Sequence, residues 1–284
     1  MNAKGKVQAF SDLLKPELPL AAGICVIAGE IISSGYLPTF AQLLLGFLTG
    51  FFISGTAMIT NDYFDLSVDK INHPDRPLPS GRITVFELIL FACLFSFAGF
   101  LAAALLNLTL LLVALAIWTI GLLYNWRIKE TGLLGNMIVA FSVASTFVFG
   151  GLVVGGLFSG IVWTFGSLAF LFDLGEEIAG GAMDIEGDKL RHARSLAILK
   201  GRNFALRVSG LLFSAFVSLS FLPFLAGWLG NLYFALVAAT DLGVVYFTFR
   251  LLTSRTPQEG RKRIRELYLT LTIAVIAIVI SRLI

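Results

Sequence analysis

Residues 39–69 read TFAQLLLGFLTGFFISGTAMIT and then NDYFDLSVD. The first 22 residues carry no charge, and a helix needs about 20 apolar residues to cross the hydrocarbon core of a bilayer. The next nine residues carry three aspartates, Asp62, Asp65 and Asp69. The stretch therefore predicts a membrane-spanning helix that ends in an acidic cluster.

The same apolar pattern recurs along the whole chain. Of the 284 residues 57% are apolar and 14% are charged, whereas soluble domains contain about 25% charged residues. This composition excludes a soluble globular protein, a disordered chain and a nucleic-acid-binding protein. We predict an all-α integral membrane protein, a single transmembrane domain over residues 1–284, with nine spans. The spans lie near residues 18–36, 39–60, 84–106, 108–126, 133–157, 160–176, 204–226, 228–250 and 266–284.

The basic residues are distributed very unevenly between the two sets of connections. All but one of the 21 Lys and Arg residues lie in the N-terminal segment or in every second connection, and the exception is Arg282. The positive-inside rule makes the basic side cytoplasmic. We therefore expect a cytoplasmic N-terminus, an extracytoplasmic C-terminus and an acidic cluster that faces the cytoplasm.

A second acidic cluster follows the sixth span. There, Glu177, Asp184 and Asp188 have the spacing of one helix face. Stacked carboxylates repel one another unless a cation lies between them, and oxygen ligands without His or Cys suit Mg²⁺ or Ca²⁺. Two such clusters that face each other could hold Mg²⁺ ions and a diphosphate. The alternative for either cluster alone is a set of solvated loop charges.

Basic residues follow both acidic clusters. Residues 72–82 read NHPDRPLPSGR, and their three prolines and one glycine cannot continue a helix. A stiff loop of this kind can direct Arg76 and Arg82 to a phosphate, which a guanidinium binds in a bidentate manner. Lys129 could contact a phosphate as a point charge. Tyr124 lies just inside the membrane boundary, where an aromatic-belt residue is the alternative.

These motifs together resemble the UbiA superfamily of intramembrane prenyltransferases. NDYFDLSVDKINHPDRPLPSGRIT is similar to the first signature of the family, YNWRIKETGLLGN to a mid-chain motif, and DIEGD to the core of the second aspartate motif. The resemblance implies nine transmembrane helices around a central cavity, with a cap of cytoplasmic loops. It also implies Mg²⁺-dependent transfer of a polyprenyl group from its diphosphate to a lipophilic acceptor in the membrane.

The resemblance also implies roles for individual residues. One Mg²⁺ would be bound by Asn61, Asp62, Asp65 and Asp69, and a second by Asp184 and Asp188. Asn61 would also lie at the diphosphate, whose oxygens Arg76, Arg82 and Lys129 would bind. Tyr124 would line the pocket near the reacting carbon, and together with Asp65, Asp69, Asp184 and Asp188 it makes up the expected catalytic set.

The second aspartate motif departs from the family pattern, which reads close to R-E-x-x-K-D-x-x-D-x-x-G-D. Glu176, Gly180 and Gly181 occupy its Arg, Lys and first Asp positions. One carboxylate and two cations are therefore missing, and Glu177 is the candidate substitute ligand. Near the first span, where the family often has Arg-Pro-Asn, this chain has Lys15, Pro16 and Glu17.

The sequence leaves the acceptor open. One candidate is geranylgeranylglyceryl phosphate, whose hydroxyl is alkylated in archaeal ether-lipid synthesis, and the other is an aromatic ring of a quinone or chlorophyll-type pathway. A third hypothesis is a cation or metabolite transporter, because Glu30, Asp173 and Asp241 are intramembrane carboxylates. Transporters, however, place their ion sites near the midplane, whereas both acidic clusters lie at helix ends.

Overall fold

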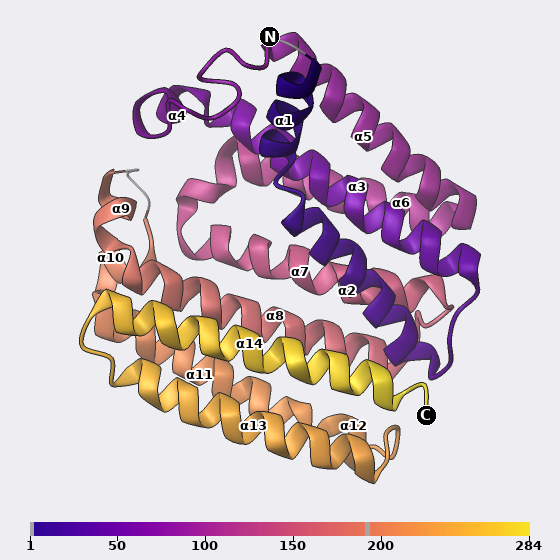
Figure 1. Cartoon of the computed structure of the whole chain (residues 1–284). Coiled ribbons are helices and arrows are strands. Elements are labelled where there is room, and N and C mark those ends of the chain that lie inside the picture. Colours follow the sequence, from indigo (N-terminus) through magenta and orange to yellow (C-terminus); the bar gives the residue numbers. More distant parts are fainter. Residues whose placement is uncertain (1–2, 191–193) are drawn as a thin grey trace. The chain divides into compact units, whose positions relative to one another are not determined.

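The computed structural model describes residues 3–190 and 194–284, with side chains for residues 5–187 and 194–284. Within these ranges the chain is helical and contains no strand (Figure 1). It divides into two compact units, Met1–Ile27 with Pro38–Arg127, and Ala28–Leu37 with Ile128–Ile284. The all-helical architecture expected from the sequence is confirmed.

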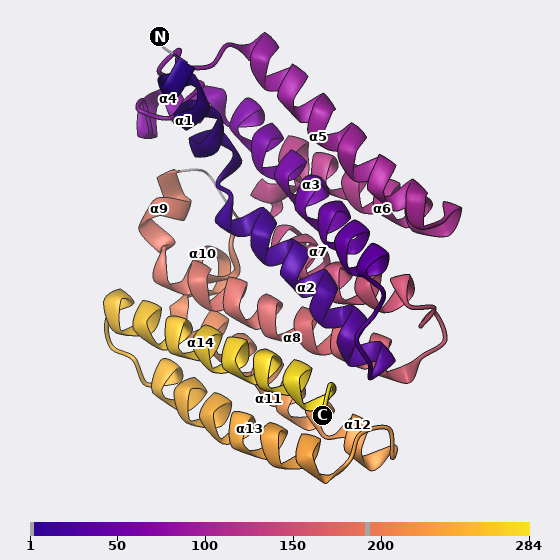
Figure 2. The ribbon, with the colours of Figure 1, turned by 45° about the vertical axis from the view of Figure 1, so that its right-hand side comes forward.

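The first unit is organised around α3 (Phe40–Phe64), which packs along α5 (Val85–Leu106) and α6 (Leu108–Leu123), as Figure 2 shows. Thr39 and Thr84 begin α3 and α5 with capping boxes, in which side chains satisfy the free N–H groups of the first turn. A short helix, α4 (Leu66–Asn72), follows α3. After α6 the chain forms one π-helical turn, η1 (Tyr124–Ile128).

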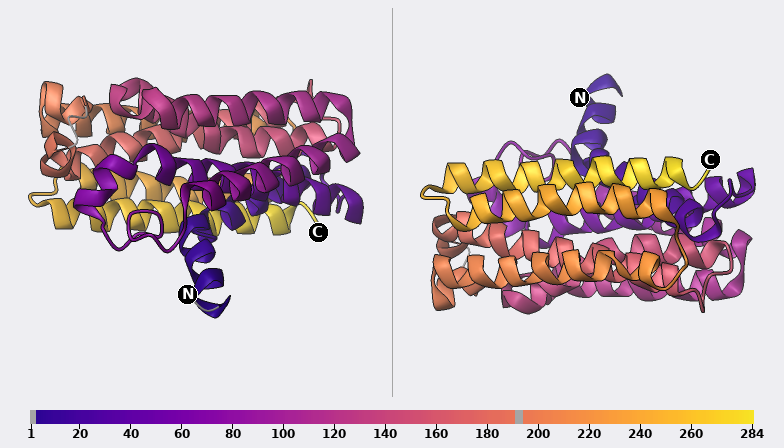
Figure 3. Two further views of the ribbon diagram at one scale, coloured as in Figure 1. Left: turned by 90° about the horizontal axis from the view of Figure 1, so that it is seen from above. Right: turned by 90° about the horizontal axis from the view of Figure 1, so that it is seen from below.

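The first unit also contains a helix that hydropathy did not indicate, α1 (Ala3–Leu14). Figure 3 shows that it runs across the direction of α3 and α5. Its Ala9 and Leu13 are fully buried against Ile59 of α3 and against Leu78 and Ile83 of the proline-rich loop. This helix therefore covers the loop that carries Arg76. The next helix, α2 (Glu17–Ser34), contributes to both units.

The second unit is organised around α8 (Gly160–Met183), which packs against α7 (Leu133–Val153), α11 (Arg202–Ser220) and α14 (Pro257–Ser281). Its core contains the aromatic residues Phe172, Phe213 and Phe216. The remaining elements are η2 (Lys129–Thr131), α9 (Ile185–Leu190), α10 (Leu196–Lys200), α12 (Leu222–Leu225) and α13 (Asn231–Leu252).

Each of the nine predicted spans coincides with a long helix in the described part of the chain. Eight of these helices are long and apolar enough to cross a membrane. The ninth is α8, whose Asp173, Glu176 and Glu177 lower its apolar character near one end. The predicted boundaries differ most at α14, which begins at Pro257 rather than near residue 266.

Arg282, the one basic residue on the less basic side, has a structural role. Its Nε donates a hydrogen bond of 3.0 Å to the carbonyl oxygen of Ile32. This carbonyl lies in the last turn of α2, where the final C=O groups of a helix lack intrahelical partners. A cation is favourable at such a helix C-terminus, so Arg282 needs no role in topology.

Close helix packing in the second unit depends on Gly29 of α2. A Cβ atom at this position would collide with the backbone carbonyl of Phe147 in α7. Gly121 of α6 is a contrasting position, because a Cβ there would meet only the Ala57 side chain at 3.8 Å. The same substitution should therefore have opposite effects at the two glycines.

We expect Gly29→Ala to destabilise the protein by about 1–3 kcal/mol, the usual cost of overpacking. Gly121→Ala should be neutral or stabilising by up to about 1 kcal/mol, because alanine favours a helix. Thermal unfolding of the purified variants in detergent measures both effects. Equal unfolding temperatures would contradict the close approach of α2 and α7.

Candidate active site

The first aspartate motif lies where α3 ends. Asp62 belongs to the last turn of α3, and its side chain is fully buried. The helix stops at Phe64, Asp65 occupies the break, and α4 then carries Asp69, which is only 3% exposed. The motif therefore places two carboxylates in a buried environment, which is costly unless cations compensate them.

Two cations contact these carboxylates, one from the junction of α1 and α2 and one from the proline-rich loop. Nζ of Lys15 lies 2.9 Å from Oδ1 of Asp62. Nη1 of Arg76 lies 2.6 Å from Oδ2 of Asp69 and 3.9 Å from Oδ1 of Asp62. One guanidinium nitrogen therefore lies within ion-pair distance of both aspartates. Lys15 was noted in the sequence only as a departure from the family pattern, and no signal in its neighbourhood links it to a residue 47 positions away.

Lys15 has an unusual backbone conformation. It is the only non-glycine residue with positive φ (49°) in the part of the chain that the structure describes. This left-handed conformation is unfavourable for a residue with a side chain. It occurs at the junction of α1 and α2, where the turn brings the Lys15 ammonium to Asp62.

The proline-rich loop forms the rigid structure that its composition predicts. The N–H of Arg76 donates to the His73 carbonyl, and the N–H of Ser80 donates to the Arg76 carbonyl. Leu78 and Ile83 anchor the loop in the core, with exposures of 6% and 1%. The Arg76 backbone is therefore fixed, while its side chain remains about one-third exposed.

Arg82 is held by contacts away from the two buried aspartates. Its Nη1 lies 2.7 Å from Oδ2 of Asp12 in α1, Nη2 donates to the Asp75 carbonyl, and Nε donates to Ser80 Oγ. The bond to Arg82 lowers the pKa of the Asp12 carboxyl, with a smaller contribution from Gln8. Arg82 thus ties α1 to the loop that presents Arg76.

The π-helical turn η1 is tied to α3 next to the first motif. Nδ2 of Asn125 donates to the Ala57 carbonyl at 2.8 Å and to Thr60 Oγ1 at 3.0 Å. Tyr124 begins the turn with a half-buried side chain, and Asn61 is also half-buried. Such π-helical turns are frequent at functional sites. The Asn125 amide thus fixes η1 to α3 through contacts that span 65 and 68 residues.

The second aspartate motif has the same helix–break–helix form, which corrects one expectation. Glu177, Asp184 and Asp188 do not share a face of one helix, because α8 ends at Met183 and α9 begins at Ile185. The Asp184 carboxylate instead lies over Gly187, where a Cβ atom would be 2.7 Å from its Oδ1. The Asp188 side chain lies outside those described.

Lys129 begins η2 with a half-buried side chain.

The donor set of the first motif suits a hard cation. No three His, Cys, Asp or Glu side chains converge on one point among the side chains described. Mg²⁺, however, commonly uses one or two carboxylates and completes its shell with water and substrate phosphates. Asp62 Oδ2 is buried and has no hydrogen-bond partner among the described residues, as expected of an oxygen available to a metal. Asp62 and Asp69 therefore fit Mg²⁺ in a shell shared with a phosphate ligand.

The intramembrane carboxylates have individual environments. Both Glu30 oxygens are buried without a partner among the residues described. Oδ2 of Asp241 accepts a 2.7 Å hydrogen bond from Ser220, whose carbonyl accepts one from the Tyr233 hydroxyl. Among the side chains described, neither carboxylate belongs to a group of three or more His, Cys, Asp or Glu residues that could hold a metal ion.

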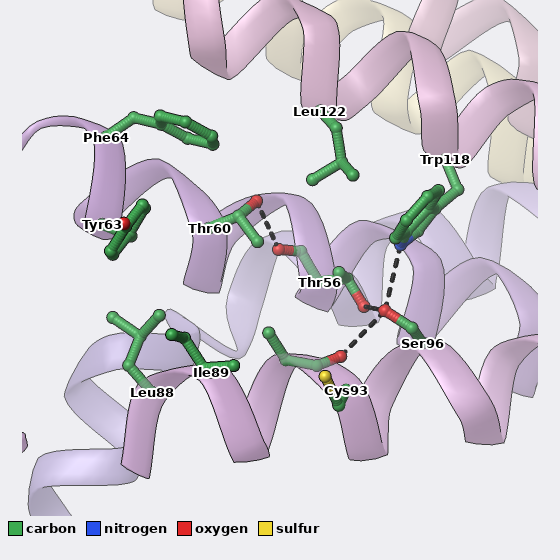
Figure 4. A pocket seen from close by; sticks show the side chains of 11 residues that line it. Thr56, Thr60, Tyr63, Phe64, Leu88, Ile89, Cys93, Ser96, Trp118 and Leu122 are labelled. Atoms are coloured by element: carbon green, nitrogen blue, oxygen red, sulfur yellow. Dashed lines mark hydrogen bonds between the residues drawn. The ribbon is translucent and has the colours of Figure 1, made fainter. Parts of the chain in front are cut away.

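A lateral pocket of about 200 Å³ lies among α3, α5 and α6 (Figure 4). The Trp118 Nε1–H donates to Ser96 Oγ, which lies 3.3 Å from Thr56 Oγ1 and donates to the Ala92 carbonyl. These polar groups already bond to one another, and the rest of the lining is mostly apolar. The pocket therefore suits hydrocarbon and offers no cation to a phosphate.

The contact between Asp12 and Arg82 generates a prediction. We expect Asp12→Ala and Arg82→Ala each to destabilise the protein by less than about 1 kcal/mol, because the pair is partly exposed. The double variant should be little worse than Arg82→Ala alone, because that variant has already lost the contact with Asp12. Asp75→Ala is the control, because the hydrogen bond from Arg82 goes to the backbone carbonyl of Asp75, which this substitution retains. A much larger loss of activity for Arg82→Ala than for Asp12→Ala would show that Arg82 also acts on the substrate.

Comparison with known proteins places these features in a family. The model of the UbiA prenyltransferase family matches residues 22–274. The chain is 32% identical over 277 residues to the digeranylgeranylglyceryl phosphate synthase of Thermococcus kodakarensis, covering 98% of this chain and 99% of that protein. It is 34% identical over 265 residues to the same enzyme of Archaeoglobus fulgidus, covering 92% and 90% of the two chains.

Solved structures show the same fold. A structure from work on digeranylgeranylglyceryl phosphate synthase in membranes matches with a TM-score of 0.85 and 28% identity over 98% of both chains. A UbiA homologue from Archaeoglobus fulgidus bound to GPP and Mg²⁺ matches with a TM-score of 0.70 and 20% identity, over 95% of this chain and 99% of that one. With the family model and the full-length relatives, these likenesses establish that the chain is an integral membrane protein of the UbiA prenyltransferase family.

Proposed function

We propose that the protein transfers a geranylgeranyl group from geranylgeranyl diphosphate to the hydroxyl of geranylgeranylglyceryl phosphate within the membrane. One observation carries this proposal. The buried carboxylates of Asp62 and Asp69 are paired with Arg76 at and just beyond the end of the membrane-spanning helix α3, in a chain that is similar over nearly its full length to digeranylgeranylglyceryl phosphate synthases. The aromatic-ring acceptor is the alternative, and the family relationship favours prenyl transfer over transport.

Mg²⁺ fits the first motif and is the proposed cofactor. Asp62 and Asp69 would bind it, with Asn61 and Asp65 in the adjoining turn. Asp184, Asp188 and Glu177 are the proposed ligands of a second ion. When bound, the metal neutralises charge on the diphosphate leaving group, which electrostatically favours its departure.

The residues of the first unit can stabilise a leaving diphosphate directly. Ionisation of the substrate breaks the bond between the allylic carbon and the diphosphate oxygen, and the electron pair leaves with the oxygen. The Arg76 guanidinium can bind two diphosphate oxygens through its planar fork. Lys15 remains at Asp62 and limits the cost of that buried carboxylate. Lys129, which belongs to the second unit, is a further proposed phosphate contact.

The reaction also requires that water be kept from the allylic cation. Water would capture the cation before the acceptor hydroxyl could form the ether bond. Apolar helices exclude water, and an aromatic face can stabilise a nearby cation, the role proposed for Tyr124. The distribution of the basic residues supports a cytoplasmic site for this chemistry, with the N-terminus inside and the C-terminus outside.

Product analysis tests the proposed acceptor. The purified protein in lipid nanodiscs should convert geranylgeranyl diphosphate and geranylgeranylglyceryl phosphate to a diether in the presence of Mg²⁺, as measured by mass spectrometry. EDTA should abolish the product, and added Mg²⁺ should restore it. In a parallel assay an aromatic acid is offered to the protein as the acceptor. A prenylated aromatic acid as the product, with no diether formed in the first assay, would support the alternative acceptor.

The Arg76 contact can be tested without a change in net charge. Arg76→Lys should lower kcat/KM by roughly 30- to 150-fold, because an ammonium cannot reproduce the guanidinium fork, and one charge-assisted hydrogen bond contributes about 2–3 kcal/mol. Arg255→Lys is the matched control, since Arg255 is exposed and lies in the connection before α14. Equal activity of the two variants would show that Arg76 is not part of the proposed site.

A further inference from the structure

Three segments that are distant in sequence meet at the end of α8. Met183, the last residue of this helix, is 3% exposed. Arg202, at the start of α11, places Nη2 3.7 Å from the Met183 sulfur and bonds the carbonyl and hydroxyl of Ser254. Arg261, in the second turn of α14, donates from Nη2 to the Met183 carbonyl at 3.1 Å.

The same Nη2 atom of Arg261 also lies 3.5 Å from Oδ1 of Asp184. The guanidinium therefore contacts both the last carbonyl of α8 and Asp184, the first aspartate of the second motif. Arg261 differs in this respect from the other cations of residues 255–265. In the described part of the chain none of those contacts Asp184, and Arg263 pairs with Glu266 instead.

Gly260 makes this contact possible. It is buried, and a Cβ atom there would collide with the Met183 sulfur. The first turns of α14 can approach the end of α8 only because position 260 has no side chain. Arg261 therefore lies at Asp184 because the neighbouring Gly260 packs closely against the buried side chain of Met183. The ion pair between Arg261 and Asp184 is itself exposed to solvent.

The surroundings of Asp184 contain space for an additional cation. Gly180 lies in the last turn of α8, and Asp184 is the residue that follows the end of this helix. A Cβ atom at Gly180 would meet nothing within 4 Å. Glu176 and Gly180 stand where the related motif has its two cations, so the motif itself supplies no positive charge next to Asp184.

We propose that Arg261 is a positioning residue of the second aspartate motif, and that its guanidinium holds the Asp184 carboxylate for metal binding in place of the missing cations. The inference rests on the proposed function, in which Asp184 binds the second ion. Partners that orient a metal ligand typically contribute roughly 10- to 100-fold to metal affinity or activity. If the only role of Arg261 were to bond the last carbonyl of α8, its replacement would lower the stability of the protein and leave metal binding unchanged.

Metal binding separates the two roles. Mn²⁺ binding to the purified protein, measured by electron paramagnetic resonance with inorganic diphosphate present, is the first readout, and the Mg²⁺ dependence of prenyl transfer is the second. Arg261→Gln should weaken binding of one Mn²⁺ by at least about tenfold and raise the half-saturating Mg²⁺ concentration similarly. Arg255→Gln, which removes the same charge from the same segment, should change neither.

A second variant tests the positional argument. Gly180→Lys places a cation in the open space of the last turn of α8, next to the end of the helix that precedes Asp184, and in the Arg261→Gln background it should restore Mn²⁺ binding to within about threefold of the wild type. Mn²⁺ binding of Arg261→Gln that equals that of Arg255→Gln would overturn the proposal. A wild-type protein that binds Mn²⁺ without forming the diether would refute the proposed acceptor, and the Mn²⁺ comparison would still test Arg261.

Discussion

The burial of the Asp62 carboxylate is the constraint on which the rest of the first unit depends. An ionised carboxylate removed from water costs several kcal/mol unless a cation and hydrogen bonds compensate it. Lys15 provides the cation, and the chain adopts a left-handed backbone conformation at that residue to bring it there. Arg76 contributes a second cation from a loop that α1 covers. The α1–α2 junction, the end of α3 and the proline-rich loop are therefore mutually dependent, and a change in one should disturb the others.

The fold was predictable because a bilayer permits few alternatives. A segment in hydrocarbon must satisfy all of its backbone hydrogen bonds internally, so an apolar run of sufficient length is a helix. Hydropathy detects the part of a helix that crosses the bilayer, and not the whole helix. It therefore placed the last span near residue 266, although the charged turns of α14 begin at Pro257. It did not detect α1, because an amphipathic helix that packs on a loop has no long apolar run.

The site was predictable in part. The aspartate spacing and the proline-rich loop pointed to Asp62, Asp69 and Arg76, because these residues lie close together in sequence. The contacts of Lys15 with Asp62 and of Arg82 with Asp12 span 47 and 70 residues. Such contacts depend on how the helices pack, and a lysine before an apolar span reads equally well as a topology signal. The break of α8 at Asp184 was also missed, since four-residue spacing alone cannot distinguish one helix from two.

The two aspartate motifs solve the same electrostatic problem. Each begins at the C-terminal end of a long helix, α3 or α8, and continues into a short helix after a break at Asp65 or Asp184. The C-terminus of a helix carries partial negative charge, so a carboxylate there is unfavourable and a cation is favourable. Lys15 and Arg76 supply positive charge at the end of α3, and Arg261 supplies it at the end of α8. All three come from other segments of the chain. The favourable positive charge at both helix ends therefore depends on contacts between segments of the chain, and not on the helix that carries the acids.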